Sequence, residues 1–300
     1  MSVQFAQLVL NGISLGSIIA LGSVGLTLTY GILRLSNFAH GDFMTLGAYA
    51  TLLVNSQGVN IWLSMIVGAL VTIAAFLLSE KLIWAPMRVR RATPATLIII
   101  SIGLALFLRN GIILIWGASN QRYNLPVAEA LEFANLRLPL YDLVVIGMAI
   151  AAIIGLRYLL QNTKIGKAMR AVADDLDLAR VAGINVDRVI FWTWIIAGGL
   201  TALGGSMLGL VEAVRPNMGW FLILPMFAAV ILGGIGNAYG AIVGAFIIGI
   251  AQEASTYCPV WLPAWLSQLC IRNEYKLAVA LVIMMLVLLV RPQGLFKGTM

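Results

Sequence analysis

The apolar run LVLNGISLGSIIALGSVGLTLTYGI, residues 8–32, decides the fold class of this chain. It carries no charged residue, and it is longer than the roughly 20 apolar residues that a helix needs to cross a bilayer. The residues before it contain no lysine or arginine, so they lack the charged start of a cleavable signal peptide. We therefore expect a first membrane helix that is retained in the protein.

The composition extends this expectation to the rest of the chain. Of its 300 residues, 61% are hydrophobic and 10% are charged, and the mean hydropathy is +0.98. Soluble domains carry roughly 25% charged residues, so an ordinary soluble enzyme, a disordered chain and a disulfide scaffold are excluded. We expect an all-α polytopic membrane protein with about eight or nine transmembrane or half-membrane helices. The predicted spans are residues 8–32, 38–54, 61–81, 95–116, 141–160, 189–211, 221–235, 238–253 and 276–290.

The net charge of +7 is explained by the positions of the basic residues, which lie at the ends of apolar runs rather than along one basic stripe. Cytoplasmic loops of membrane proteins carry an excess of lysine and arginine. Placing the two strongest basic clusters inside puts thirteen of the nineteen basic residues in the cytoplasm and five outside. Nine spans then predict an outer N-terminus and an inner C-terminus. The clusters are Arg88, Arg90, Arg91 and Lys164, Lys167, Arg170.

Two breaks interrupt the apolar pattern and look alike. The first is Asn37-Phe38-Ala39-His40-Gly41-Asp42, and the second is Gly233-Gly234-Ile235-Gly236-Asn237, which divides residues 221–253 into two short runs. These runs predict either two short crossings or a re-entrant pair of half-helices. Paired interrupted helices in transporters point to a substrate pathway, although glycine and alanine also promote close helix packing. The candidate pathway residues are Asn37, Phe38, His40, Gly41, Gly234 and Asn237.

Residues able to carry chemistry are scarce. The chain has one histidine, two cysteines and no clustered carboxylates within the spans, so it lacks a metal-ligand set and a nucleophile–base pair. It also lacks the Gly-x-x-x-x-Gly-Lys-Ser/Thr loop that cradles nucleotide phosphates. We expect no catalytic residue, no metal, no cofactor and no enzyme activity in this chain.

Three polar side chains in or beside the spans invite specific interpretations. His40 is either a hydrogen-bonding part of the pathway or a turn residue whose ring binds local backbone. Asp42 is expected to complement the positive start of a helix. Arg109 is expected to reach the outer surface or to pair with Glu212 or Glu253.

Residues 161–188 are the most informative segment outside the membrane. Asp174 or Asp175 is a natural N-cap, Arg180 suits a last helical turn, and Gly183 suits a left-handed C-terminal position. These signals predict a helix of about two turns, which is too short to be stable alone in water. The helix therefore needs a partner, unless the segment is a solvated connecting loop.

The docking surface of this short helix is expected to be narrow and apolar. Leu176, Ala179 and Ala182 recur at helical spacing and would share one face. The candidate docking residues are Lys167, Arg170, Asp174, Asp175, Leu176, Ala179, Arg180 and Gly183.

Several motifs follow one another in an order that is typical of one transporter family. They are Asn11-Gly12-Ile13-Ser14-Leu15-Gly16-Ser17, Tyr30-Gly31-Ile32-Leu33, residues 37–42, 167–173 and 182–185, Gly233-Gly234-Ile235-Gly236-Asn237 with Gly240-Ala241, and Arg291-Pro292-Gln293-Gly294-Leu295. With these motifs the chain resembles the permeases of branched-chain amino acid ABC importers, most of all the H-type subunit. The resemblance implies the ABC-importer permease fold. It also implies a second homologous permease, two ATPase subunits docked inside and a periplasmic solute-binding protein as partners.

The same resemblance implies a function. The chain would be a single permease domain, residues 1–300, that moves branched-chain or other neutral amino acids through the bacterial inner membrane. Residues 161–188 would be its cytoplasmic coupling loop, and ATP would be hydrolysed on the partner ATPases. A urea or amide permease of the same family is the alternative. An ion-coupled secondary transporter is a rival class, which needs intramembrane carboxylates that the spans largely lack.

The two cysteines, Cys258 and Cys270, both fall in the predicted outer loop, residues 254–275. An oxidising compartment outside the inner membrane permits a disulfide between them. Such a bridge would close a loop of about 13 residues and contribute on the order of 3 kcal/mol. The alternative is that both cysteines pack as small apolar side chains.

Overall fold

The computed structural model describes residues 2–126, 130–133, 136–258, 272–291 and 293–296. Each of the nine predicted spans forms a helix, so the expected all-α membrane fold is confirmed. Six of these helices are long and apolar enough to cross a membrane, α13 when it is counted together with the 3-10 turn Asn273–Tyr275 that precedes it. Helices α2, α10 and α11 are shorter, with 16 or 17 residues. The nine helices are α1 (Ser2–Leu33), α2 (His40–Asn55), α3 (Ile61–Ser79), α5 (Pro94–Trp116), α6 (Leu140–Asn162), α9 (Val186–Val211), α10 (Met218–Gly233), α11 (Ala238–Ala254) and α13 (Lys276–Val290).

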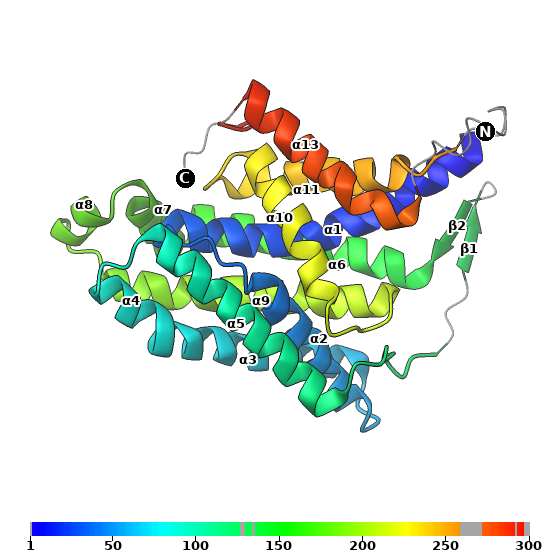
Figure 1. The fold of residues 1–300 in the computed structure, drawn as a ribbon, viewed down its shortest axis with the longest axis horizontal. Coiled ribbons are helices and arrows are strands. Elements are labelled where there is room, and N and C mark those ends of the chain that lie inside the picture. The colour runs from blue at the N-terminus through cyan, green and yellow to red at the C-terminus, as the bar shows by residue number, and fades with distance from the viewer. Residues whose placement is uncertain (1, 127–129, 134–135, 259–271, 292, 297–300) are drawn as a thin grey trace.

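Helices α1 and α9 lie near the centre of the bundle, whereas α5 and α13 lie at its periphery (Figure 1). In α1 and α9, 67% and 72% of the most apolar window is buried by the rest of the chain. In α5 and α13 these fractions are only 17% and 6%, although both helices are as apolar as the central ones. An outer helix can leave a wide apolar face open only where lipid or another subunit covers it. The peripheral helices therefore form the surface that meets the bilayer or a partner.

Small residues bring α1 and α11 into the most extensive helix–helix contact of the described chain. A Cβ atom added at Gly12 would lie 2.6 Å from the Cα of Ile250, and one added at Gly249 would lie 2.5 Å from the Cα of Gly16. These positions need glycine because the two backbones touch there. At the other end of the contact, the amide of Gly236 donates to Thr27 Oγ1 at 3.1 Å. Helix α11 therefore runs antiparallel to α1 along most of its length.

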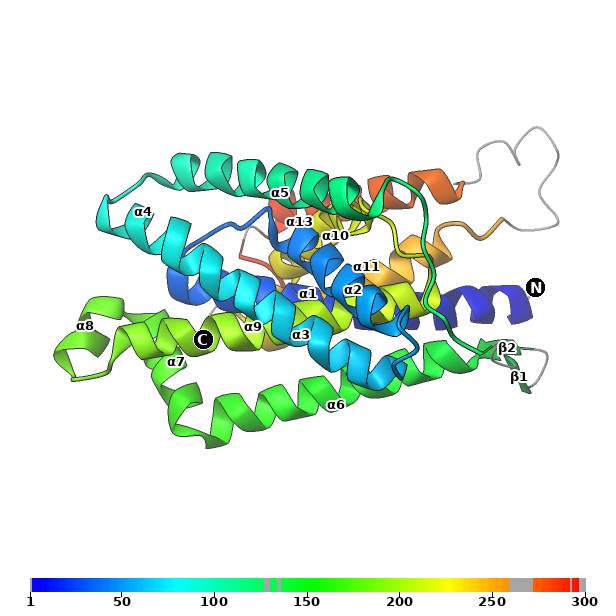
Figure 2. The same ribbon diagram turned by 90° about the horizontal axis from the view of Figure 1, so that it is seen from below.

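Helices α2 and α10 both begin inside the bundle, where their N-termini meet (Figure 2). A Cβ atom at either Gly41 or Gly219 would overlap the carbonyl of the other residue. The Gly219 amide donates to Thr45 Oγ1 at 3.1 Å, which satisfies one of the free donors at the start of α10. After α1 and after α9, which end at opposite ends of the bundle, the chain turns back into the bundle. The short helices α2 and α10 then begin there.

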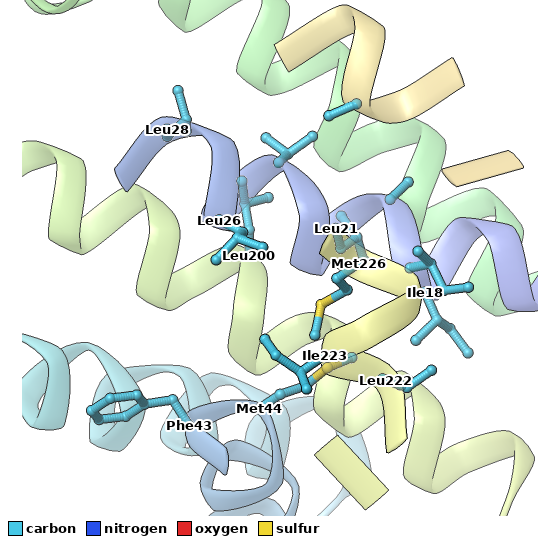
Figure 3. Packing of buried hydrophobic residues seen from close by; sticks show 14 of the residues in the cluster. Ile18, Leu21, Leu26, Leu28, Phe43, Met44, Leu200, Leu222, Ile223 and Met226 are labelled. Carbon is cyan, nitrogen blue, oxygen red and sulfur yellow. The ribbon is translucent and has the colours of Figure 1, made fainter. Parts of the chain in front are cut away.

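The core between these helices is aliphatic and sulfur-rich. Figure 3 shows Met226 of α10 between α1, which carries Ile18 and Leu21, and α2, which carries Phe43 and Met44. All five side chains are buried to 1% exposure or less. The unbranched methionine side chains fill the irregular space where three helices cross at different angles.

A short β-ribbon between α5 and α6 was not expected from the sequence. Strands β1 (Ala130–Phe133) and β2 (Leu136–Pro139) pair antiparallel, with Ala130 opposite Pro139. The side chain of Gln7 holds the ribbon to α1, since it accepts from the amide of Arg137 at 3.0 Å and donates to its carbonyl at 2.8 Å. The ribbon lies at the same end of the bundle as the start of α1 (Figure 1).

Candidate functional site

The predicted short helix in the segment 161–188 is present as α8 (Leu176–Val181). Asp175 is its N-cap, and Oδ1 of this residue accepts from the amides of Asp177 and Leu178, both at 2.9 Å. Gly183 follows the helix with φ = +83°, the left-handed conformation that the sequence indicated. The local prediction from capping residues is confirmed, and α8 projects from the end of the bundle opposite the start of α1 (Figure 1).

A second helix, α7 (Lys164–Asp174), precedes α8. The sequence analysis did not predict it. Thr163 caps it by accepting from the Gly166 amide at 3.1 Å. Met169 and Val172 are buried on one face against the bundle, whereas the lysines and arginine of this helix are exposed on the other. The spacing of its apolar residues carried this information, because positions three and four apart lie on one face of a helix. Helix α7 packs on α6 and α9 and so supports α8.

The exposed apolar face of α8 differs from the expected one. Ala179 is only 4% exposed and Leu176 is half-buried, because both face the rest of the chain. Leu178 and Val181 are 67% and 87% exposed instead. The expectation that Ala179 offers its side chain to a partner is therefore wrong. Leu178 and Val181 are exposed apolar residues of α8 instead, and this pair is called the apolar docking stripe below, after the role that is proposed for it. The other candidate docking residues, Lys167, Arg170, Asp174, Asp175, Arg180 and Gly183, are all exposed.

The first break, between α1 and α2, is buried inside the subunit. Oδ1 of Asn37 accepts from the Ala39 amide at 3.1 Å, which turns the chain into α2, and its Nδ2 is buried without a partner among the described residues. The Phe38 amide donates to Ser101 Oγ of α5 at 3.2 Å. The Phe38 ring lies 4.8 Å from the ring of Phe227 in α10. Non-helical backbone at this depth is tolerated because protein surrounds it.

His40 links three helices at the start of α2. Its Nε2 lies 3.0 Å from the carbonyl oxygen of Gly22 in α1 and 2.9 Å from Thr201 Oγ1 in α9. A carbonyl only accepts, and the Thr201 hydroxyl already donates to the Ala197 carbonyl at 2.6 Å, so Nε2 carries the proton and donates to both. The His40 ring therefore binds a backbone carbonyl, as one of the two interpretations held, but this carbonyl belongs to α1 and not to the turn that contains His40.

Asp42 and Arg109 form an ion pair that the sequence did not reveal. Nε of Arg109 donates to Oδ1 of Asp42 at 3.0 Å, and Nη2 donates to Oδ2 at 3.1 Å. The guanidinium also lies 4.5 Å from the ring centre of Trp220 at the start of α10. The expectation that Arg109 reaches the outer surface or pairs with Glu212 or Glu253 is wrong. Asp42 is buried in the first turn of α2 as expected, but a cation from α5 balances it.

The expected outer acid has a different partner. Glu253 Oε1 accepts from Nζ of Lys276 at 2.6 Å, which ties the end of α11 to the start of α13. Glu212 follows α9 and is exposed.

The second break joins α10 to α11 in a turn that requires glycine. Gly234 and Gly236 have φ angles of +103° and +88°, a conformation that other residues rarely adopt. Oδ1 of Asn237 caps α11 by accepting from the amides of Tyr239 and Gly240, both at 3.0 Å. In both breaks, therefore, the side-chain oxygen of an asparagine accepts from the backbone amide two residues later. The two breaks thus share a local geometry as well as a similar sequence.

The C-terminal segment covers this second break. The amide of Leu295 donates to the Leu232 carbonyl at 2.8 Å, and the amide of Phe296 donates to the Gly233 carbonyl at 3.3 Å. The last carbonyl groups of a helix have no hydrogen-bond donor within the helix itself. The amides of Leu295 and Phe296 supply donors to two of these carbonyls at the end of α10. Gly234 is buried beneath this segment, whereas Asn237 is half-buried.

The predicted disulfide falls partly outside the described residues. Cys258 is the last described residue before residues 259–271, and Cys270 lies within that range. The bridge between them stays a prediction.

Comparison with known proteins shows the family of this chain. The sequence model of the family described as "Branched-chain amino acid transport system / permease component" matches residues 8–288. The high-affinity branched-chain amino acid permease LivH of Escherichia coli K12 is 33% identical, and the match covers 98% of this chain and 96% of that protein. BraD of Pseudomonas aeruginosa is 28% identical over 97% of this chain and 95% of its own length. A probable LivH of Methanocaldococcus jannaschii is 31% identical over 96% and 92%.

One solved structure shares the arrangement of helices. PsaBC from Streptococcus pneumoniae, solved in complex with a Fab, superposes with a TM-score of 0.52 at 14% sequence identity. The superposition covers 94% of this chain and 91% of the other. At this identity the likeness concerns the fold alone.

Proposed function

Because the chain belongs to the branched-chain amino acid transport system permease family, we propose that it is the membrane subunit of an ATP-driven importer for branched-chain or other neutral amino acids. The match over residues 8–288, with relatives similar along nearly their whole length, carries this proposal. Residues 1–300 act as one permease domain. The relatives are named for branched-chain amino acids, which favours this substrate class over urea and amides.

The proposed assembly contains a second homologous permease, two ATPase subunits and a periplasmic solute-binding protein. The described residues contain no group of three or more metal-ligating side chains, and the sequence has no phosphate-binding loop. ATP hydrolysis is therefore assigned to the partners. The uneven distribution of basic residues favours an outer N-terminus and an inner C-terminus.

Helices α7 and α8 are the proposed coupling segment. Helix α8 has six residues, so it depends on contacts with its surroundings to stay folded. Its capping at Asp175 and its support by α7 hold Leu178 and Val181 out in solvent. Exposed leucine and valine on a supported helix fit an apolar groove of a partner. We assign the apolar docking stripe to the ATPase subunit.

The two breaks are the proposed moving parts of the substrate pathway. Phe38 of the first break contacts Phe227 of α10, and the second break ends the same helix. Helix α10 therefore connects them. A displacement of α10 would change both breaks together and would expose Asn37 and His40, which are buried in this conformation.

A matched pair of valine substitutions tests the proposed coupling. Val181→Asp places a charge in the docking stripe, and Val3→Asp makes the same change at an exposed valine in the first turn of α1, at the other end of the bundle. We expect V181D to insert normally but to lose ATPase co-purification and ATP-dependent uptake of labelled leucine in proteoliposomes. We expect V3D to retain both. Wild-type uptake by V181D would show that α8 does not couple ATP hydrolysis to transport, and leucine uptake without ATP would refute the proposed function itself.

A further inference from the structure

A groove of about 390 Å³ lies between the start of α7 and the start of α9. None of its lining residues is acidic. Two cations, Lys164 and Arg188, stand at its rim, and the groove is otherwise mainly apolar. Its apolar part includes Ile165, Ala168, Val189 and Trp192.

The two cations come from different helices and have no counter-ion among the described residues. Lys164 is the first residue of α7, and Arg188 lies in the first turn of α9. Both side chains are exposed, and neither takes part in a described ion pair. The nearby carboxylate of Asp187 does not line the groove. Two positively charged side chains thus line one groove, and neither forms an ion pair with a described residue.

Apolar side chains of both helices lie beside the two cations: Ile165 and Ala168 follow Lys164 on α7, and Val189 and Trp192 follow Arg188 on α9. Trp192 lies one helical turn after Arg188, so the two side chains share a face about 6 Å apart along the axis. Tryptophan is enriched at the boundary between headgroups and acyl chains. The groove therefore combines two cations with a tryptophan and aliphatic side chains, as a phospholipid combines a charged phosphate with a glycerol backbone and acyl chains.

We propose that this groove binds one anionic phospholipid of the cytoplasmic leaflet, with the phosphate between Lys164 and Arg188 and an acyl chain along Trp192. The proposal rests on the proposed function, which places this end of the bundle at the cytoplasmic surface. Basic pockets between helices on that side suit anionic headgroups. An acidic peptide would use the cations but not the tryptophan and aliphatic side chains beside them.

Native mass spectrometry of the detergent-purified permease tests the site without reference to transport. We expect the wild-type protein to retain phosphatidylglycerol in preference to phosphatidylcholine with the same acyl chains. The double variant K164Q/R188Q should lose about 30-fold in apparent phosphatidylglycerol affinity, as expected for two cations at an anionic membrane surface. The control R122Q/R215Q removes two exposed cations at the other end of the bundle and should bind like wild type.

A second variant separates shape from charge. Ala168→Trp fills the groove but leaves both cations in place, and it should lower phosphatidylglycerol retention as well. Inorganic phosphate should not displace the lipid, because it lacks the acyl chain. Equal retention of both lipids, or wild-type retention by K164Q/R188Q, would overturn the proposal. So would loss of ATPase co-purification in K164Q/R188Q with lipid retention unchanged, because the groove would then belong to the ATPase contact.

Discussion

Removing the charge of Arg109 tests whether the buried ion pair holds α5 to the bundle. Arg109→Met keeps an unbranched side chain but leaves the Asp42 carboxylate, which is 0% exposed, without the donors at 3.0 and 3.1 Å. An unpaired buried charge costs about 3–5 kcal/mol. We therefore expect R109M to lower the free energy of unfolding by about that amount. Asp42→Asn should cost less, about 1–3 kcal/mol, because the guanidinium keeps its contact with Trp220 and is partly exposed.

Unfolding in mixed micelles with a rising fraction of denaturing detergent, followed by circular dichroism, measures these free energies. The double variant D42N/R109M should be more stable than R109M by about 1–3 kcal/mol, because no charge remains unpaired. Asn110→Met is the control, since its amide bonds only the Leu106 carbonyl of its own helix. Wild-type stability of R109M, or strictly additive effects in the double variant, would refute the role given to the pair.

Three further outcomes are expected. Gly219→Ala should abolish recovery of folded protein in size-exclusion chromatography, because its Cβ overlaps backbone, whereas Gly103→Ala has open space and should be neutral. Mass spectrometry after alkylation of the denatured protein should find Cys258 and Cys270 unmodified without reductant and both modified with it; two reactive thiols before reduction would exclude the bridge. Asn37→Cys in a background without other cysteines should resist a small hydrophilic thiol reagent at rest and react during ATP-driven turnover, and inertness in every nucleotide state would remove Asn37 from the pathway.

The sequence predicted the helices well because membrane spans are set by composition over long windows. The nine runs and the caps of α8 depend on neighbouring residues, so they could be located without knowing the fold. The β-ribbon was missed because four-residue strands leave too short a pattern. Helix α7 was not predicted although Ile165, Met169 and Val172 repeat at helical spacing, because this apolar pattern covers only two turns and basic residues interrupt it.

The contacts of the candidate site could not be predicted in the same way. Asp42 and Arg109 lie 67 positions apart, and His40 and Thr201 lie 161 apart. Hydropathy shows that a charge in a span needs a partner, but it does not show which helix supplies it. The face of α8 was assigned wrongly for a related reason. Which side of a short amphipathic helix faces the chain depends on α7 and α9, whose packing appears only in three dimensions.

The contact between α1 and α11 sets a condition on the synthesis of this protein. Helix α1 is made first, but the residues that meet Gly12 and Gly16 belong to a helix about 240 residues later. At a translation rate of about 5–20 residues per second, α1 waits roughly 10–50 s for this neighbour. During that time a backbone surface without side chains faces lipid or the insertion machinery. A chain that stalls before residue 238 never covers it, so truncated products should be preferred targets of membrane quality-control proteases.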